Sequence, residues 1–126
     1  MLTRGSIYIA NLPKSMNSSV QGGLRPVIVV QNDAGNAHSP TVQVIPLTSR
    51  TKKPLPIHVV VRGSACGLEK ESIALTEQIQ TIDKTNIHHY IGKLDDATME
   101  KVNACILIQL GLLANTKRGG NKKWKS

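Results

Sequence analysis

The side chains that most often do chemistry in proteins are sparse in this 126-residue sequence. The histidines are His38, His58, His88 and His89, and no pair has the spacing to cysteine or carboxylate residues that metal sites use. On a strand, the adjacent His88 and His89 would face opposite sides and could not readily share an ion. Nucleophile-elbow, P-loop and dinucleotide-binding motifs are also absent from the sequence. We therefore expect no metal site and no cofactor.

One loop contains an unusual backbone sequence. Residues 21–25 read QGGLR and lead into a β-branched run rather than a helix. The glycine pair is therefore not the phosphate-binding N-terminus of a helix. The simplest interpretation of Gly22 and Gly23 is a turn that needs a positive φ angle.

Charge is distributed unevenly along the chain. Residues 1–62 carry seven Lys or Arg and one acid, a net of +6, whereas residues 63–116 carry four and seven, a net of −3. Residues 117–126 add five positive charges, which completes the total of +8. This asymmetry favours a polyanion-binding face built by the early segments, the alternative being scattered charges that only aid solubility. The chain has two Tyr, one Trp and no Phe, so nucleic-acid binding would depend on hydrogen bonds and charge rather than stacking.

The overall composition is that of one soluble domain. The length fits a single core, and no apolar run approaches the ~18 residues of a membrane helix. The N-terminal residues lack the apolar stretch of a signal peptide. Cys66 and Cys105 are far apart without C-x-x-C spacing, which is typical of buried, reduced thiols. We expect a cytoplasmic protein with no membrane partner.

The elements that must position any site are mostly strands. Strands are predicted at residues 6–11, 25–32, 41–48, 57–62 and 72–79, with a sixth at 88–94. Residues 32–36 carry turn residues, and residues 83–86 favour one helical turn capped by Asp83. The pattern predicts a mainly β protein, a small and strongly bent antiparallel barrel.

One longer helix is predicted to pack on this barrel. Asp95 or Asp96 can cap it. Its apolar stripe recurs at three- and four-residue steps: Met99, Val102, Ile106, Leu110 and Leu113. The stripe ends near residue 114, so we expect a domain over residues 1–114 and a disordered basic tail over residues 115–126.

Four segments carry a resemblance to a known family. They are RGSIY at residues 4–8, QGGLRPVIVVQND at 21–33, VIPLTS at 44–49 and LTEQIQTIDK at 75–84. In order and spacing they resemble the motifs of the MazF/PemK family of endoribonuclease toxins, over roughly residues 4–113. Each motif alone is weak, and their common order makes the resemblance specific.

The resemblance implies an SH3-like barrel of the CcdB/PemK type that forms a homodimer. It implies a sequence-specific endoribonuclease that cleaves single-stranded RNA without a metal and is held inactive by a cognate antitoxin. The family's catalytic Arg and Thr fall on Arg25 and Thr48. The residues expected to contact RNA lie in or beside the same motifs: Ser19, Gln21, Gly22, Pro26, Ser49, Arg50 and Gln78, with Lys52 and Lys53 as further candidates for phosphate contacts.

Elementary chemistry is consistent with such a pair. In this type of cleavage the substrate's own 2′-OH attacks the adjacent phosphorus, so the protein supplies no nucleophile, and the ends are a 2′,3′-cyclic phosphate and a 5′-OH. Arg25 offers a planar fork of donors to the charged phosphorane, and Thr48 can donate a hydroxyl hydrogen bond. The roles of general acid and base stay open. Gln78 is expected to be a strand amide able to read a base edge, the alternative being a plain hydrogen bond at the rim of the core.

Departures from the family pattern affect base preference and loop contacts more than catalysis. Val20 stands where relatives carry Glu, Gln80 where many carry Arg, and Ser6 where many carry Asp. The antitoxin is expected to present an acidic, partly disordered segment to the same basic face. The alternative function is a non-catalytic CcdB-like barrel that binds gyrase or nucleic acid, which would not need Arg25 and Thr48.

Overall fold

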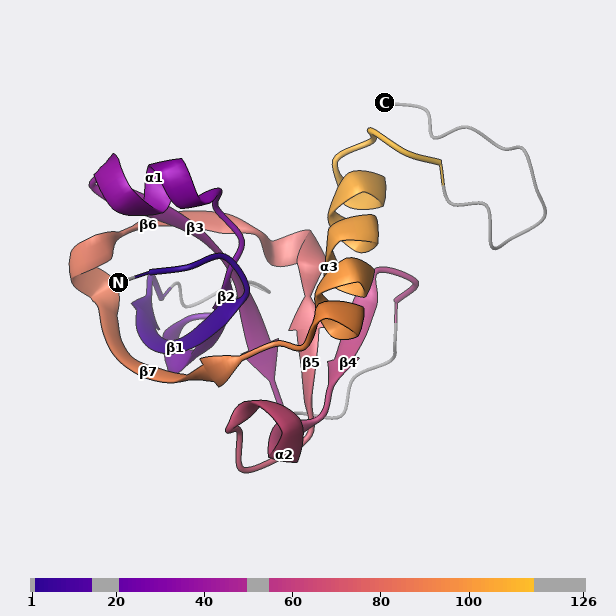
Figure 1. The fold of residues 1–126 in the computed structure, drawn as a ribbon, viewed down its shortest axis with the longest axis horizontal. Coiled ribbons are helices and arrows are strands. Elements are labelled where there is room, and N and C mark those ends of the chain that lie inside the picture. The colour runs from indigo at the N-terminus through magenta and orange to yellow at the C-terminus, as the bar shows by residue number, and fades with distance from the viewer. Residues whose placement is uncertain (1, 15–20, 50–54, 115–126) are drawn as a thin grey trace.

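Short β-branched segments build a strongly bent antiparallel sheet with a helix at one side (Figure 1). The computed structural model describes residues 2–14, 21–49 and 55–114. The described residues form seven strands: β1 (Ser6–Leu12), β2 (Gly23–Val29), β3 (Thr41–Thr48), β4 (His58–Val61), β5 (Ser72–Leu75), β6 (Gln80–Asp83) and β7 (Ile87–Lys93). The helices are α1 (Asp33–His38), α2 (Gly63–Cys66) and α3 (Asp96–Gln109), with 3₁₀ turns η1 (Thr76–Gln78) and η2 (Lys84–Asn86).

Strand β3 connects the two halves of the sheet. The strand order is β4-β5-β3-β2-β1-β7, with β6 also paired to β3, and all pairs are antiparallel. The first half of β3 pairs with β6 and its middle with β2, while Leu47 and Thr48 pair with β5. Thr48 therefore ends a strand that is held on several sides.

Apolar side chains fill both faces of the sheet. Val27 and Val29 lie in one core cluster, while Ile28, between them, lies in the other, and all three are fully buried. A strand buried on both faces reads as a continuous apolar run. Each such side chain stabilises the fold by roughly 1.5–3 kcal/mol. Strand β2, which carries Arg25 near its start, is therefore anchored in the core by Val27, Ile28 and Val29.

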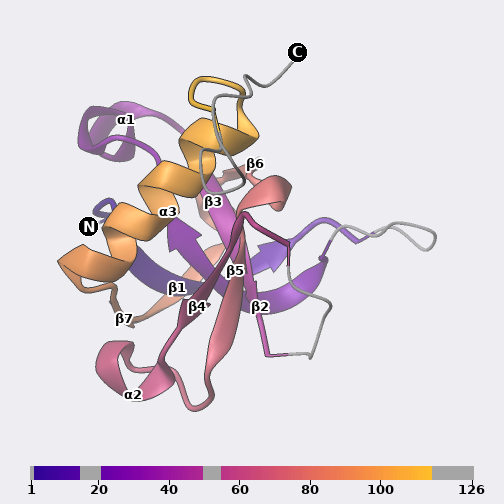
Figure 2. The ribbon, with the colours of Figure 1, turned by 90° about the vertical axis from the view of Figure 1, so that its right-hand side faces the viewer.

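Helix α3 lies across β4 and contacts η1 (Figure 2). Asp95 is its N-cap, and the Asp95 carboxylate accepts a hydrogen bond from the Thr98 backbone N–H at 2.7 Å. This hydrogen bond lowers the pKa of Asp95. Val102 is fully buried against the core, but Leu110 is 54% exposed. Only the first part of the predicted apolar stripe therefore covers the barrel.

Several local predictions were wrong. Residues 32–36 are not a simple turn, because Asn32 caps α1 and its side chain accepts from the Gly35 N–H at 2.8 Å. The predicted strand at 72–79 ends at Leu75 and continues as η1, in which the Thr76 hydroxyl bonds to the Ile57 carbonyl. Strand β6 was missed because Ile82 is its one buried side chain, and α2 was also missed. The predicted tail lies outside the described residues.

Candidate active site

A cleft of about 530 Å³ opens beside the end of β3. Its walls come from β1, β2, β3, β5, β7 and the connection between α2 and β5: Ile9, Leu24, Arg25, Pro26, Leu47, Thr48, Ser49, Gly67, Leu68, Glu69, Lys70, Ser72, His89 and Ile91. Arg25, Pro26, Thr48 and Ser49, which the sequence nominated from two separate motifs, thus line the same cleft. The fold gathers the nominated catalytic pair although the two residues lie on different strands.

Arg25 lies near the start of β2, opposite Ala10 of β1. Its side chain is half-buried, and its Nε–H donates to the Gly22 carbonyl oxygen at 3.1 Å. A guanidinium held through Nε presents its other nitrogens in a defined direction. The backbone of residues 21–23, here called the glycine loop, therefore orients the candidate catalytic cation.

The two glycines of that loop are needed for different reasons. Gly23 has a φ angle of +79°, which fits the turn interpretation. Gly22 does not have a positive φ angle, but a Cβ placed on it would lie 2.6 Å from the Pro13 carbonyl oxygen. Only glycine fits this close approach, and the carbonyl of Gly22 is the one that receives the Arg25 hydrogen bond.

Thr48 is the last residue of β3 and lies opposite Ile73 of β5. It is only 3% exposed, whereas the neighbouring Ser49 is exposed. A hydroxyl in this position is fixed by the strand and partly shielded from water. Any hydrogen bond that it donates to a ligand is stronger than it would be in water.

Gln78 contacts the glycine loop. The prediction that it lies in a strand was wrong. It lies in η1, and its Oε1 accepts from the Gln21 backbone N–H at 2.7 Å. Gln80 donates from Nε2 to the Gln78 carbonyl at 3.3 Å. Gln21, Gly22 and Gln78 are not among the described residues that line the cleft. Their observed contacts position the loop.

Some nominated residues cannot be placed. Ser19 and Arg50, together with Val20, Lys52 and Lys53, lie outside the described residues. Their proposed RNA contacts remain predictions.

The structure adds polar residues that the sequence did not nominate. Glu69, Lys70 and Ser72 reach the cleft from the segment after α2, and His89 reaches it from β7. Ile9 pairs with both Pro26 and His89, so these three form a row across β2, β1 and β7. Strand alternation could have placed His89 and Ile91 on one face, but only the sheet order places that face beside Arg25.

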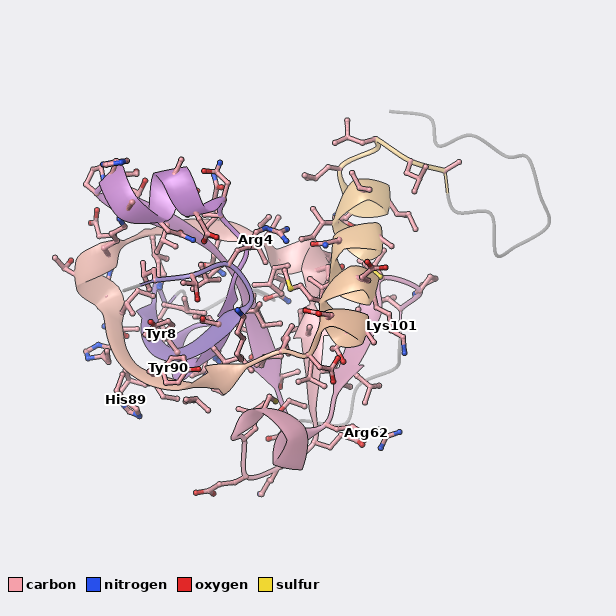
Figure 3. The ribbon with its side chains drawn as sticks, in the orientation of Figure 1. Arg4, Tyr8, Arg62, His89, Tyr90 and Lys101 are labelled. Carbon is pink, nitrogen blue, oxygen red and sulfur yellow. The ribbon has the colours of Figure 1, made fainter. Side chains whose placement is uncertain are left out.

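Among the described cations of residues 1–62, Arg25 lines the cleft, whereas Arg4 and Arg62 do not. Arg4 donates from Nε to the Val30 carbonyl at 2.7 Å, and Arg62 pairs with Glu71 at 3.1 Å. Figure 3 shows Arg4 between α1 and α3, and Arg62 beside α2. Of the described cations only Arg25 and Lys70 line the cleft, and Lys70 comes from the acidic part of the chain. The positive charge at the cleft therefore depends on which residues the fold brings there, and not on the net charge of the chain segment that each comes from.

The thiols and tyrosines offer no obvious nucleophile. Burial raises the pKa of the Cys66 thiol, and its Sγ donates to the Arg62 carbonyl oxygen at 3.3 Å. Tyr8 and Tyr90 lie edge to face, with their ring centroids 5.5 Å apart (Figure 3). Burial, together with the neighbouring Tyr90, raises the pKa of Tyr8. Within the described ranges no three His, Cys, Asp or Glu side chains gather as a metal site, and no helix is long and apolar enough to cross a membrane.

Fold and site together define a small antiparallel β protein with a C-terminal helix, whose cleft presents an oriented Arg and a buried Thr hydroxyl. Residues 3–110 match the family described as PemK-like, MazF-like toxin of type II toxin–antitoxin systems. The chain belongs to this family. The resemblance in the four sequence motifs, and the mainly β fold predicted with it, are confirmed.

Individual relatives extend this result. The chain is 44% identical to Endoribonuclease MazF of Staphylococcus saprophyticus over 113 residues, which are 89% of this chain and 93% of that protein. A mycobacterial endoribonuclease solved in complex with its cognate antitoxin is 27% identical, with a TM-score of 0.73 over 91% of this chain and 100% of that one. MazF from Deinococcus radiodurans has a TM-score of 0.74 at 22% identity, over 87% of this chain and 96% of that one, and shows the fold alone.

Proposed function

We propose that this protein is an endoribonuclease toxin that cleaves single-stranded RNA at specific sequences, through attack of the substrate's 2′-OH and without a metal. The observation that carries the proposal is the meeting of Arg25 and Thr48 in one cleft, with Arg25 oriented by the Gly22 carbonyl. The close relationship to a protein named Endoribonuclease MazF supports the activity.

The scissile phosphate would lie between Arg25 and Thr48. As the 2′-OH attacks, negative charge grows on the non-bridging oxygens, and the guanidinium fork can donate two hydrogen bonds to them. The Thr48 hydroxyl, which lines the same cleft, can donate another. Preorganised donors aimed at developing charge are worth roughly 2.7–4 kcal/mol each. The attacking and leaving oxygens both belong to the RNA, which gives a 2′,3′-cyclic phosphate and a 5′-OH.

The remaining walls of the cleft suit the nucleotides beside the cut. Lys70 and His89 can contact flanking phosphates, and Ser49 and Ser72 can hydrogen-bond to sugar or base edges. Apolar contact with the bases comes from aliphatic side chains, because no Phe, Tyr or Trp is among the described residues that line the cleft. Base preference would therefore depend on hydrogen bonds more than on stacking.

A cognate antitoxin would neutralise the enzyme. The family assignment and the antitoxin complex of the mycobacterial relative support this part of the proposal. The net charge of +8 favours an acidic, partly disordered antitoxin segment that competes with RNA. We propose a cytoplasmic homodimer, in line with the family resemblance.

Sequencing the 5′ ends produced from a long mixed-sequence RNA tests the proposal. We expect a small set of cut sites that share a short sequence, in excess EDTA as well as with Mg²⁺. Activity that disappears in EDTA and returns with Mg²⁺ would contradict the metal-independent mechanism. Intact RNA together with binding to gyrase would favour the CcdB-like alternative.

A further inference from the structure

The short turn η1 is bonded to two separate segments of the chain, the loop before β2 and the start of β4. Each of its residues makes a different contact: Thr76 Oγ1 donates to the Ile57 carbonyl at 2.5 Å, Glu77 Oε2 bonds to His58 Nε2 at 3.0 Å, and Gln78 Oε1 accepts from the Gln21 N–H at 2.7 Å. Gln21 precedes the glycine that orients Arg25. His58 is the first residue of β4, and Ile57 directly precedes it.

The hydrogen bonds of His58 fix the orientation of its ring and indicate its tautomer. Its Nδ1 accepts from the Leu55 backbone N–H at 3.2 Å, so the ring proton must be on Nε2. Nε2–H then donates to Glu77 Oε2. The His58 side chain is 5% exposed and that of Glu77 is 23% exposed. The buried imidazole thus links η1 to the backbone at Leu55.

This link is not needed to hold the strands together. Strands β4 and β5 already pair through four residues on each, from His58–Leu75 to Val61–Ser72. The second carboxylate oxygen of Glu77 is buried and has no hydrogen-bond partner, which costs stability. Removing a polar pair with such a defect is often neutral for folding when apolar groups replace it. What the pair holds is η1 itself, against the start of β4, and with it the neighbouring Gln78.

We propose that His58 and Glu77 are positioning residues for RNA cleavage. They hold η1 against the start of β4, and the adjacent Gln78 in η1 fixes the loop whose Gly22 carbonyl orients Arg25. The position of this turn thereby sets the position of the loop that directs the guanidinium. This inference rests on the proposed function, because its effect is on the rate of RNA cleavage.

The test compares wild type with Glu77→Ala, Glu77→Gln and His58→Asn. We expect kcat to fall about 10- to 100-fold in Glu77→Ala, the scale on which small misplacements of catalytic groups act. Glu77→Gln should stay within about threefold of wild type, because an amide oxygen still accepts from His58 Nε2–H. Asn at position 58 can accept from Leu55 but is too short to reach Glu77, so its kcat should also fall at least about tenfold.

The exposed Arg62–Glu71 pair supplies a matched control, because it also joins β4 to the start of β5 but does not contact η1. Glu71→Gln should leave kcat unchanged. The double variant Glu77→Ala/His58→Ala should be no slower than Glu77→Ala alone, since both remove one link. Every rate is measured at a temperature well below each variant's Tm, with Kd for an uncleavable 2′-deoxy RNA measured in parallel.

The outcomes separate this inference from the proposed function. If wild type leaves RNA intact, the proposed function fails. If wild type cleaves and Glu77→Ala keeps its kcat while only its Tm falls, the pair is structural and the inference is wrong. An equal loss of kcat in Glu71→Gln would also overturn it. Should Glu77→Ala not fold, His58→Asn alone decides, and wild-type kcat in that variant refutes the positioning role.

Discussion

Replacing Arg25 by alanine should reduce RNA cleavage about 10²- to 10³-fold. The side chain is the one guanidinium among the described residues that line the cleft, and its Nε–H bond to Gly22 fixes its direction. Removing a preorganised donor from developing charge costs roughly 2.7–4 kcal/mol, and each 1.4 kcal/mol is about tenfold in rate. Arg25 is half-buried and leaves no cavity in the core clusters. The free energy of unfolding should therefore fall by only about 1 kcal/mol, for the carbonyl that loses its donor.

Arg25→Lys separates charge from geometry. Lysine keeps the positive charge but lacks a donor at the Nε position, so it loses the bond to the Gly22 carbonyl and the bidentate fork. We expect its KM to stay close to that of wild type while most of the loss in kcat remains. This outcome would assign the effect to orientation and not to charge alone.

The assay is single-turnover cleavage of a short RNA that carries a fluorophore and a quencher on either side of the mapped cut site. Circular dichroism and size-exclusion chromatography establish that each variant is folded and has the oligomeric state of wild type. Binding to a 2′-deoxy version of the same oligonucleotide shows that the cleft still accepts the substrate. Cleavage by Arg25→Ala at a rate near that of wild type would refute the assignment of the site.

Three further predictions use the same preparations. Thr48→Val keeps the shape of a side chain that is 3% exposed and removes its hydroxyl. Its kcat should fall about 10²-fold in the single-turnover assay, while the oligomeric state stays that of wild type and antitoxin binding is retained. Gly22→Ala must displace the backbone near Pro13, so kcat should fall more than KM rises, whereas an unchanged kcat would mean that the loop does not orient Arg25. Asp95→Ala removes the cap of α3 and should lower Tm at pH 7. The hydrogen bond from the Thr98 backbone N–H lowers the pKa of Asp95. The ionised carboxylate therefore stabilises the folded state above about pH 4, and this stabilisation is lost as the pH falls. The difference in Tm between wild type and Asp95→Ala should shrink between pH 7 and pH 3.

Much of the strand pattern could be predicted from local sequence. Strand β3 has the predicted bounds because its alternating and β-branched residues favour an extended chain. The stretch after residue 72 was predicted less well, because side-chain hydrogen bonds of Thr76 and Gln78 to distant segments turn the chain into η1. Such contacts have no signature in a short window of sequence.

The residues of the site, like the strands, could be predicted only where a local motif contains them. Arg25 and Thr48 could be nominated because each lies within a contiguous motif. His89 and Lys70 could not, because they reach the cleft only through the order of the strands and the path of the chain after α2. The interpretation of the glycine pair was half complete, since a positive φ explains Gly23 but the close approach to Pro13 explains Gly22.

In the proposed mechanism the RNA supplies its own nucleophile. The most direct measurement is cleavage of one oligonucleotide with a single 2′-deoxy substitution at the nucleotide 5′ of the mapped cut. Mass spectrometry of the products from the all-ribose control should give a 2′,3′-cyclic phosphate, or its hydrolysed form, and a 5′-OH. The single substitution should abolish cleavage while binding remains. Cleavage of the substituted RNA at the same bond, or products with a 5′-phosphate, would contradict the mechanism.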